Sequence, residues 1–184
     1  MLSRAYEIES QLVEWRRDFH RHPELGFHET RTARVIAETL IRLGCRARTG
    51  VGRTGVIGEL GYGFPVIAIR ADMDALPIEE ANPVPYASVH TGIMHACGHD
   101  AHMAMALGAA QLLSQCDLKG TVRFLFQPAE EVADEEGISG APRMIEDGAM
   151  QDVNAVIALH VSSYLPVGQI EISPGSSSAG VDTF

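Results

Sequence analysis

The sequence predicts an α/β protein in which helices are layered against one β-sheet. Strand-like apolar runs at 121–126 and 155–161 are separated by a short helical segment near 142–147, an alternation typical of βαβ units. The segment 100–115 has helical character and is small and apolar nearly all round, as expected of a helix buried on several sides. A chain of 184 residues is long enough for one domain with a sizeable core.

Two amphipathic helices are expected before the first strand. In the first helix, apolar side chains recur at helical spacing: Ile8, Leu12, Trp15 and Phe19. Ser3 can cap this helix, and Pro23 ends it because proline lacks the backbone donor that a helix needs. The second helix is expected to begin near Thr30 and to end at Gly44, a residue type common at helix C-termini.

A hairpin-like pair of strands is expected next, at 54–60 and 65–70, because two short β-rich runs flank a glycine-rich turn. The stretch 71–98 contains no long periodic segment. Loops of this length in compact domains are usually functional or disordered. One more short strand is expected at 168–172, followed by a flexible connector at 173–180.

The composition indicates an acidic protein without the features of nucleic-acid or membrane binding. Fourteen Lys and Arg against 24 Asp and Glu give a formal net charge of −10, whereas nucleic-acid binding needs basic surface. The chain has no apolar run of about 18 residues, and its polar start lacks the apolar segment of a secretory signal. The three cysteines are too scattered for a disulfide scaffold: Cys45, Cys97 and Cys116. We therefore expect a cytoplasmic globular protein.

The densest group of chemically active residues lies just before the buried helix. Five of them fall within eight positions: His95, Cys97, His99, Asp100 and His102. Cys97 and His99 are two residues apart, so an extended backbone directs both side chains to the same side. A thiolate and an imidazole there can share a transition-metal centre. The alternative is that Asp100 is only a helix N-cap and the histidines are surface loop residues.

A second group, Glu130 and Glu131, lies in the segment 127–131 that directly follows the apolar strand 121–126. In open α/β sheets, sites form at the carboxyl ends of strands. Adjacent carboxylates cannot easily point to the same place, so one can ligate a metal while the other takes a proton from metal-bound water. The alternative is a solvated acidic run, because 134–136 continues the negative charge.

Two further strand ends carry polar residues. His160 ends the apolar run 155–161, and Asp72 and Asp74 follow the run 65–70. One of these aspartates could orient a histidine ligand. Simpler readings are that His160 caps the edge of the core and that Asp72 pairs with Arg70. Taken together, thiolate, imidazole and carboxylate donors suit zinc or manganese rather than calcium or magnesium.

These motifs resemble those of the M20 metallopeptidases, in particular the amidohydrolase branch of hippurate hydrolases, N-acyl-amino-acid amidohydrolases and auxin-conjugate hydrolases. The matching stretches are RRDFHRHPELGFHETRTA (16–33), IRADMDALPI (69–78), MHACGHDAHMAMALGAA (94–110), FQPAEE (126–131) and IALHV (157–161). They cover nearly the whole chain in the family's order. The resemblance implies a zinc-peptidase-like layered catalytic domain into which a smaller lid domain is inserted.

The resemblance also implies roles for individual residues. The ligands of a two-metal centre would be Cys97, His99, Glu131 and His160. Cys97 would bridge the metals, which would be manganese or zinc, or else cobalt or nickel. Glu130 would be the general base, and Asp72 matches the family's orienting aspartate. Other branches have a histidine where this chain has Arg70.

Family members are about twice as long, so the resemblance implies that 1–180 form the N-terminal part of the catalytic domain and that the chain is truncated where the lid begins, at 181–184. The expected activity is hydrolysis of the amide bond of small N-acyl amino acids such as hippurate, with Glu130 activating a metal-bound water. Such a fragment is expected to be inactive alone, and the full-length form to be a homodimer. An M20 dipeptidase or aminopeptidase and a non-catalytic metal-binding remnant stay open as alternatives.

Overall fold

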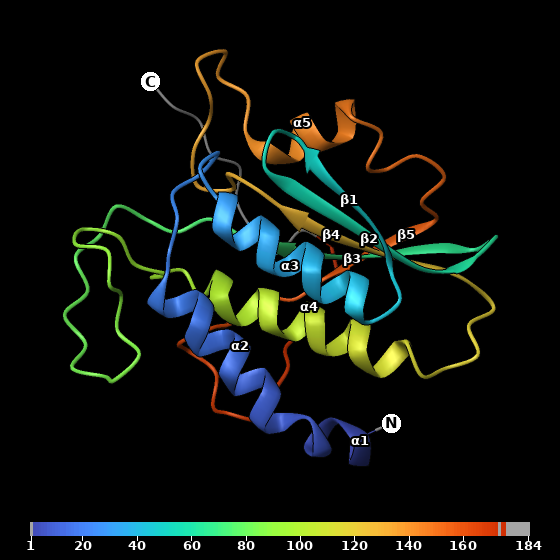
Figure 1. Ribbon diagram of the computed structural model, residues 1–184, viewed down its shortest axis with the longest axis horizontal. Coiled ribbons are helices and arrows are strands. Elements are labelled where there is room, and N and C mark those ends of the chain that lie inside the picture. The colour runs from blue at the N-terminus through green and yellow to red at the C-terminus, as the bar shows by residue number, and fades with distance from the viewer. Residues whose placement is uncertain (1, 173, 176–184) are drawn as a thin grey trace.

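A computed structural model describes residues 2–172 and 174–175 of the chain (Figure 1). The described helices are α1 (Leu2–Glu7), α2 (Glu9–Arg21), α3 (Thr30–Arg42), α4 (His99–Leu113) and α5 (Gly140–Glu146). The described strands are β1 (Arg46–Val51), β2 (Gly55–Tyr62), β3 (Val66–Asp72), β4 (Gly120–Gln127) and β5 (Ala155–Ala158). The strands form one five-stranded sheet in the order β1-β2-β4-β3-β5.

The predicted α/β class and the shared sheet are confirmed, because the runs at 54–60, 65–70, 121–126 and 155–161 all supply strands of this sheet. β4 pairs with β3 in parallel, and the connection between them passes through α4, which packs on both strands. β5 pairs in parallel with the other side of β3. The carboxyl ends of these three strands therefore lie at one edge of the sheet.

The predicted hairpin of 54–60 with 65–70 is wrong. β4 lies between β2 and β3, pairing antiparallel with β2, and β2 instead forms a hairpin with β1. No strand was expected at β1, whose residues are mostly exposed and polar and so lack the apolar alternation of a strand.

Several elements differ from the prediction. The first helix is divided, since Ile8 departs from helical geometry between α1 and α2, and Ser3 lies within α1 rather than capping it. β5 ends at Ala158, so His160 follows the strand. Residues 168–172 form no strand. Residue 173 and residues 176–184 lie outside the described residues, and with them most of the predicted connector and the predicted lid boundary.

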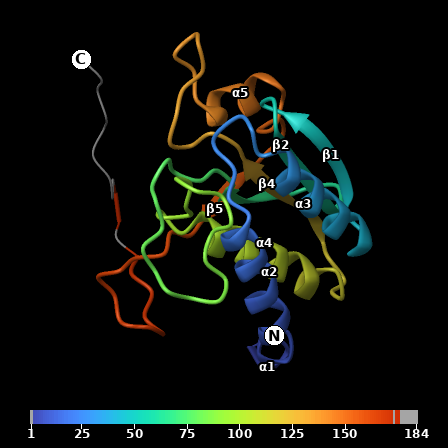
Figure 2. The same cartoon turned by 60° about the vertical axis from the view of Figure 1, so that its left-hand side comes forward.

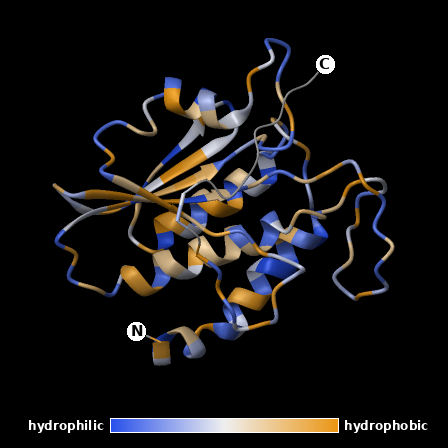
Figure 3. Cartoon of the chain, turned by 180° about the vertical axis from the view of Figure 1, so that it is seen from behind, coloured by the Kyte–Doolittle hydropathy of each residue, from blue (hydrophilic) through white to orange (hydrophobic). Residues whose placement is uncertain are grey.

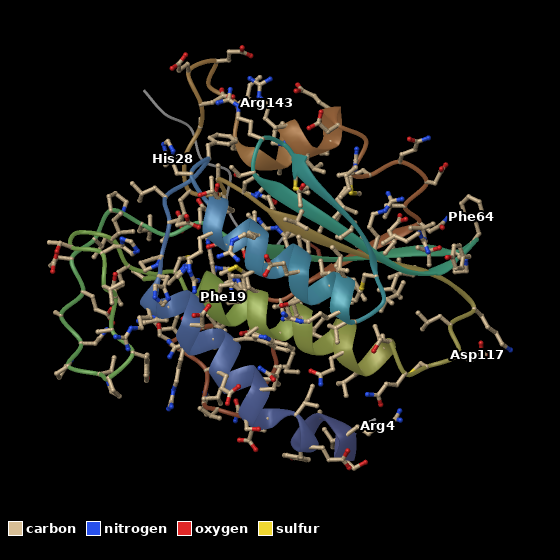
Figure 4. The ribbon with its side chains drawn as sticks, viewed as in Figure 1. Arg4, Phe19, His28, Phe64, Asp117 and Arg143 are labelled. Carbon is tan, nitrogen blue, oxygen red and sulfur yellow. The ribbon has the colours of Figure 1, made fainter. Side chains whose placement is uncertain are left out.

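The core consists of two apolar layers, one on each face of the sheet. Alternate β4 side chains point to opposite faces: Phe124 and Phe126 pack with α3 and α4, while Leu125 packs with Met144 of α5. Phe19 of α2, labelled in Figure 4, is fully buried in the larger layer. Figure 3 shows the apolar residues concentrated in the sheet and on the helix surfaces turned towards it.

Two long connections lie on the same side of the molecule. Figure 2 shows the segment between β3 and α4, in green, beside the segment that follows β5, in orange-red. Both segments begin at the carboxyl ends of parallel strands. Among the described helices, none has the length and apolar character needed to cross a membrane.

We expect Gly58→Ala to lower the free energy of unfolding by about 1–3 kcal/mol, because overpacking a dense core has a cost of this size. A methyl group at Gly58 of β2 would lie 2.8 Å from Leu40 Cδ1, and Leu40 of α3 is fully buried. Urea unfolding measures the change. The double variant Gly58→Ala/Leu40→Ala should lose less stability than the sum of the two single losses, because truncating Leu40 makes room for the added methyl group. Additive losses would contradict this packing.

Candidate metal centre

The carboxyl edge of the sheet brings together the polar residues expected to form a site. Asp72 ends β3, Glu130 and Glu131 follow β4, and His160 follows β5. Because α4 starts at the same edge, Cys97 and His99 also lie there. Gly98 between them adopts a left-handed conformation with φ of 85°, which suits glycine and turns the chain sharply into the helix.

The donor atoms of these side chains are close enough to share metal ions. Cys97 Sγ lies 3.5 Å from His160 Nε2, and one donor atom from each of Cys97, His99 and His160 lies within 4.8 Å of the others. His99 Nε2 lies 3.8 Å from Glu131 Oε1, and Glu130 belongs to the same close group. Metal–ligand bonds of about 2.0–2.3 Å require donors at such separations around each ion.

His99 is oriented as a metal ligand needs to be. Its Nδ1–H donates a hydrogen bond of 2.8 Å to the backbone carbonyl of Asp74, which leaves Nε2 as the free nitrogen. Nε2 is buried, and no hydrogen-bond partner for it is found within the described ranges. A bound cation would give this buried nitrogen a partner, and the thiol, imidazole and carboxylate groups around it fit a metal centre.

Asp72 contacts Arg70, as the simpler alternative expected, and also His102, a histidine that is not among the expected ligands. Its Oδ2 lies 2.6 Å from Arg70 Nη1, and its Oδ1 accepts a 2.6 Å hydrogen bond from His102 Nδ1. Burial alone would raise the pKa of Asp72, but His102, His99 and Arg70 hold that pKa well below its usual range. Asp72 is therefore a carboxylate that orients His102 and lies 3.7 Å from His99 Nε2.

His102 has a structural task that the sequence did not reveal. With Nδ1–H bound to Asp72, its Nε2 accepts the backbone N–H of Val161 at 3.0 Å. This bond fixes the chain beside His160, whose ring centroid lies 4.5 Å from that of His102. His102 therefore holds the segment that carries His160. Its place in the cluster of five did not reveal this contact, because the contact depends on where Val161 lies after folding.

Asp100 is not the N-cap of α4, and it belongs to none of the close groups of metal-binding side chains found among the described residues. Gly98 occupies the N-cap position of α4, and Asp100 is fully buried in the first turn. Asp100 Oδ2 lies 2.8 Å from both Arg16 Nε and His20 Nδ1 of α2. These contacts tie the start of α4 to α2.

The two glutamates differ in their surroundings. The N–H of Glu131 donates to Asp74 Oδ2 at 2.9 Å, which directs its side chain towards His99. Glu130 is exposed, yet partial desolvation and the nearby charges of Glu131 and Asp72 raise its pKa, as suits a group that accepts protons. In the acidic stretch that follows, Asp134 forms an ion pair with Arg143 instead of facing the metal-binding side chains.

Cys97 and His95 are uncharged in this environment. Burial and the neighbouring carboxylates raise the pKa of the Cys97 thiol to about 12, so its thiolate would form only with a cation. Burial lowers the pKa of His95 to about 4, and neither ring nitrogen has a partner among the residues described. His95, Cys97 and His160 line a cavity of about 640 Å³ together with residues 162–164.

Comparison with known proteins supports the resemblance. Residues 68–182 match the model of the peptidase family M20/M25/M40. The chain is 44% identical over 182 residues to an N-acyl-L-amino acid amidohydrolase of Geobacillus stearothermophilus, covering 97% of this chain and 48% of the relative. It is 43% identical over 185 residues to the IAA-amino acid hydrolase ILR1-like 2 of Arabidopsis thaliana, covering 99% of this chain and 41% of the relative.

A solved structure shows the same fold. The Bacillus subtilis YXEP protein, described as a dinuclear metal binding peptidase from the M20 family, superposes with a TM-score of 0.85 at 44% identity. The match covers 92% of this chain and 48% of that protein. The chain thus spans about half the length of the proteins it matches.

Zinc binding should release about one more proton from the wild-type chain than from Cys97→Ser at pH 7. The reason is that a thiol with a pKa of about 12 is protonated before zinc binds and ionised afterwards. Zinc affinity of the wild type should accordingly rise with pH. Calorimetry in two buffers of different ionisation enthalpy counts the protons. Cys116→Ser, which alters another free cysteine, is the control and should match the wild type. Equal proton release from Cys97→Ser would rule out Cys97 as a ligand.

Proposed function

The chain belongs to the M20 family of peptidases, and on this basis we propose that the protein hydrolyses the amide bond of N-acyl amino acids in a metal-dependent reaction. The observation that carries the proposal is the free, buried Nε2 of His99, which faces Cys97, His160 and Glu131. Relatives named as an N-acyl-L-amino acid amidohydrolase and an IAA-amino acid hydrolase support the substrate class.

Four side chains would hold the metal ions: Cys97, His99, Glu131 and His160. Cys97 Sγ is the proposed bridge, and manganese or zinc is the expected metal, with cobalt or nickel as substitutes. When bound, the ions would polarise the amide carbonyl and lower the pKa of the attacking water. The residues around them keep this donor set in place, since Asp74 orients His99 and His102 holds the segment of His160.

Glu130 is the proposed general base. It belongs to the close donor group with His99 and Glu131, and its raised pKa makes it a better proton acceptor than an ordinary carboxylate. Glu130 would take a proton from the attacking water and deliver it to the leaving amine. Asp72 stays ionised beside His99 and His102 and keeps the site negatively charged, which favours cations.

The substrate would enter through the cavity beside Cys97 and His160. Its volume of about 640 Å³ suits a small acylated amino acid, and neutral His95 offers a hydrogen-bonding group there. We further propose that the enzyme acts on a small molecule in the cytoplasm and that its full-length form is a homodimer, as the family resemblance implies.

Glu130→Gln should lower kcat for hippurate hydrolysis by about 10²–10⁴-fold in the manganese- or zinc-loaded full-length protein, the usual contribution of a general base. KM and metal content should stay unchanged, because glutamine removes only the proton acceptor. The control is Glu135→Gln, an exposed acid of the same loop. Undiminished turnover of Glu130→Gln would exclude it as the base. Cleavage of unacylated dipeptides in place of hippurate would instead favour a dipeptidase.

A polypeptide of residues 1–184 alone should bind one metal ion more weakly than the other and show little hydrolysis. With Cys97 shared, four ligands leave one ion with fewer than the three protein ligands usual for catalytic zinc. Calorimetric titration with manganese or zinc, followed by a hippurate assay, measures both properties. Bound metal without turnover would also fit the non-catalytic alternative. Two tight sites with near-normal turnover would contradict this ligand count.

A further inference from the structure

A buried glutamate, Glu29, connects three distant segments of the chain. It precedes α3, next to His28, which Figure 4 labels, and its side chain is fully buried. One carboxylate oxygen, Oε1, accepts the backbone N–H of Ala129 at 2.8 Å. The other oxygen accepts the hydroxyl of Thr54, which precedes β2. Both oxygens are thus used, and neither contacts the proposed metal ligands.

Ala129 has a conformation that needs support. Its φ is 43°, in the left-handed region that residues other than glycine rarely adopt. The carbonyl of Ala129 accepts the N–H of Gly140 at 2.9 Å. Gly26 lies so close that a side chain there would meet Ala129 Cα at 3.1 Å. Such a backbone persists only where the surroundings hold it.

The turn at Ala129 sets the direction of the next two residues, Glu130 and Glu131. A left-handed residue turns the chain sharply after β4 instead of continuing the strand. After this turn the N–H of Glu131 reaches Asp74 Oδ2 at 2.9 Å, and Glu131 Oε1 lies 3.8 Å from His99 Nε2. The conformation of Ala129 therefore determines whether the glutamates face His99.

We propose that Glu29 is a positioning residue for the metal centre, holding Ala129 in its left-handed turn so that Glu130 and Glu131 face His99. The inference rests on the proposed function, because it takes Glu131 as a metal ligand. Burial raises the pKa of Glu29, so keeping its carboxylate ionised at this position opposes folding. Its two hydrogen bonds offset part of this cost. Their effect on the turn that carries Glu130 and Glu131 explains why an acidic residue is kept in the core.

Cobalt titration of the whole chain tests whether Glu29 positions the metal-binding glutamates. A cobalt–thiolate absorption band from Cys97 reports ions bound at the site. Glu29→Ala should weaken cobalt binding by about 10–100-fold, the usual effect of losing a group that orients a ligand. Glu29→Gln should restore the affinity, because its amide oxygen still accepts from Ala129 and its NH₂ can donate to Thr54. The control is Ile36→Ala, which truncates a fully buried side chain of α3 and should leave cobalt affinity unchanged.

The outcomes separate the two claims. If Glu29→Ala binds cobalt as tightly as Ile36→Ala, the positioning role is wrong while the metal centre stands. If the wild type shows no thiolate band, or the band persists in Cys97→Ser, the proposed centre fails and this inference fails with it. Should Glu29→Ala not fold, Glu29→Asp keeps the carboxyl group but shortens the side chain by one methylene. It should weaken binding likewise, and wild-type affinity would overturn the role.

Discussion

The parallel pairing of β3 with β4 and β5 is the constraint on which the site depends. Asp72 lies opposite Gln127 in the register, so the residues that follow each strand emerge at the same edge. The connection from β3 through α4 to β4 also requires α4 to start at that edge, which places His99 there. The parallel pairing of β3 with β4 and β5 therefore brings side chains from four separate segments of the sequence to one edge of the sheet.

Acidic side chains can be buried at this edge because each of them has basic side chains as ion-pair or hydrogen-bond partners. Arg70 and His102 pair with Asp72, and Arg16 and His20 pair with Asp100. The hydrogen bond to Asp100 is the chief cause of the raised pKa of His20, and burial opposes that shift. Unpaired charges in such positions would oppose folding. The same contacts explain how an otherwise apolar α4 can begin with several polar residues.

The sequence predicted what depends on local pattern and missed what depends on distant pairing. Apolar runs ending in polar residues identified β3, β4 and β5 and the candidate ligands after them. β1 escaped prediction because an exposed edge strand has no apolar face to reveal it. The short connection between β2 and β3 suggested a hairpin, whereas β4 inserts between them through contacts of long sequence separation. The task of His102 likewise depends on where Val161 falls after folding.

Two left-handed residues direct the ligand segments, and they differ in what sustains them. Gly98 adopts its conformation without a steric cost, so the Cys97–His99 turn needs little outside help. Ala129 lies in the same region with a side chain, and its backbone groups are bound by Glu29 and Gly140. Glycine at position 129 would relieve the strain but would also let the loop take other conformations. Alanine allows fewer backbone conformations than glycine, and the hydrogen bond from Ala129 to Glu29 stabilises the conformation in which Glu130 and Glu131 face the site.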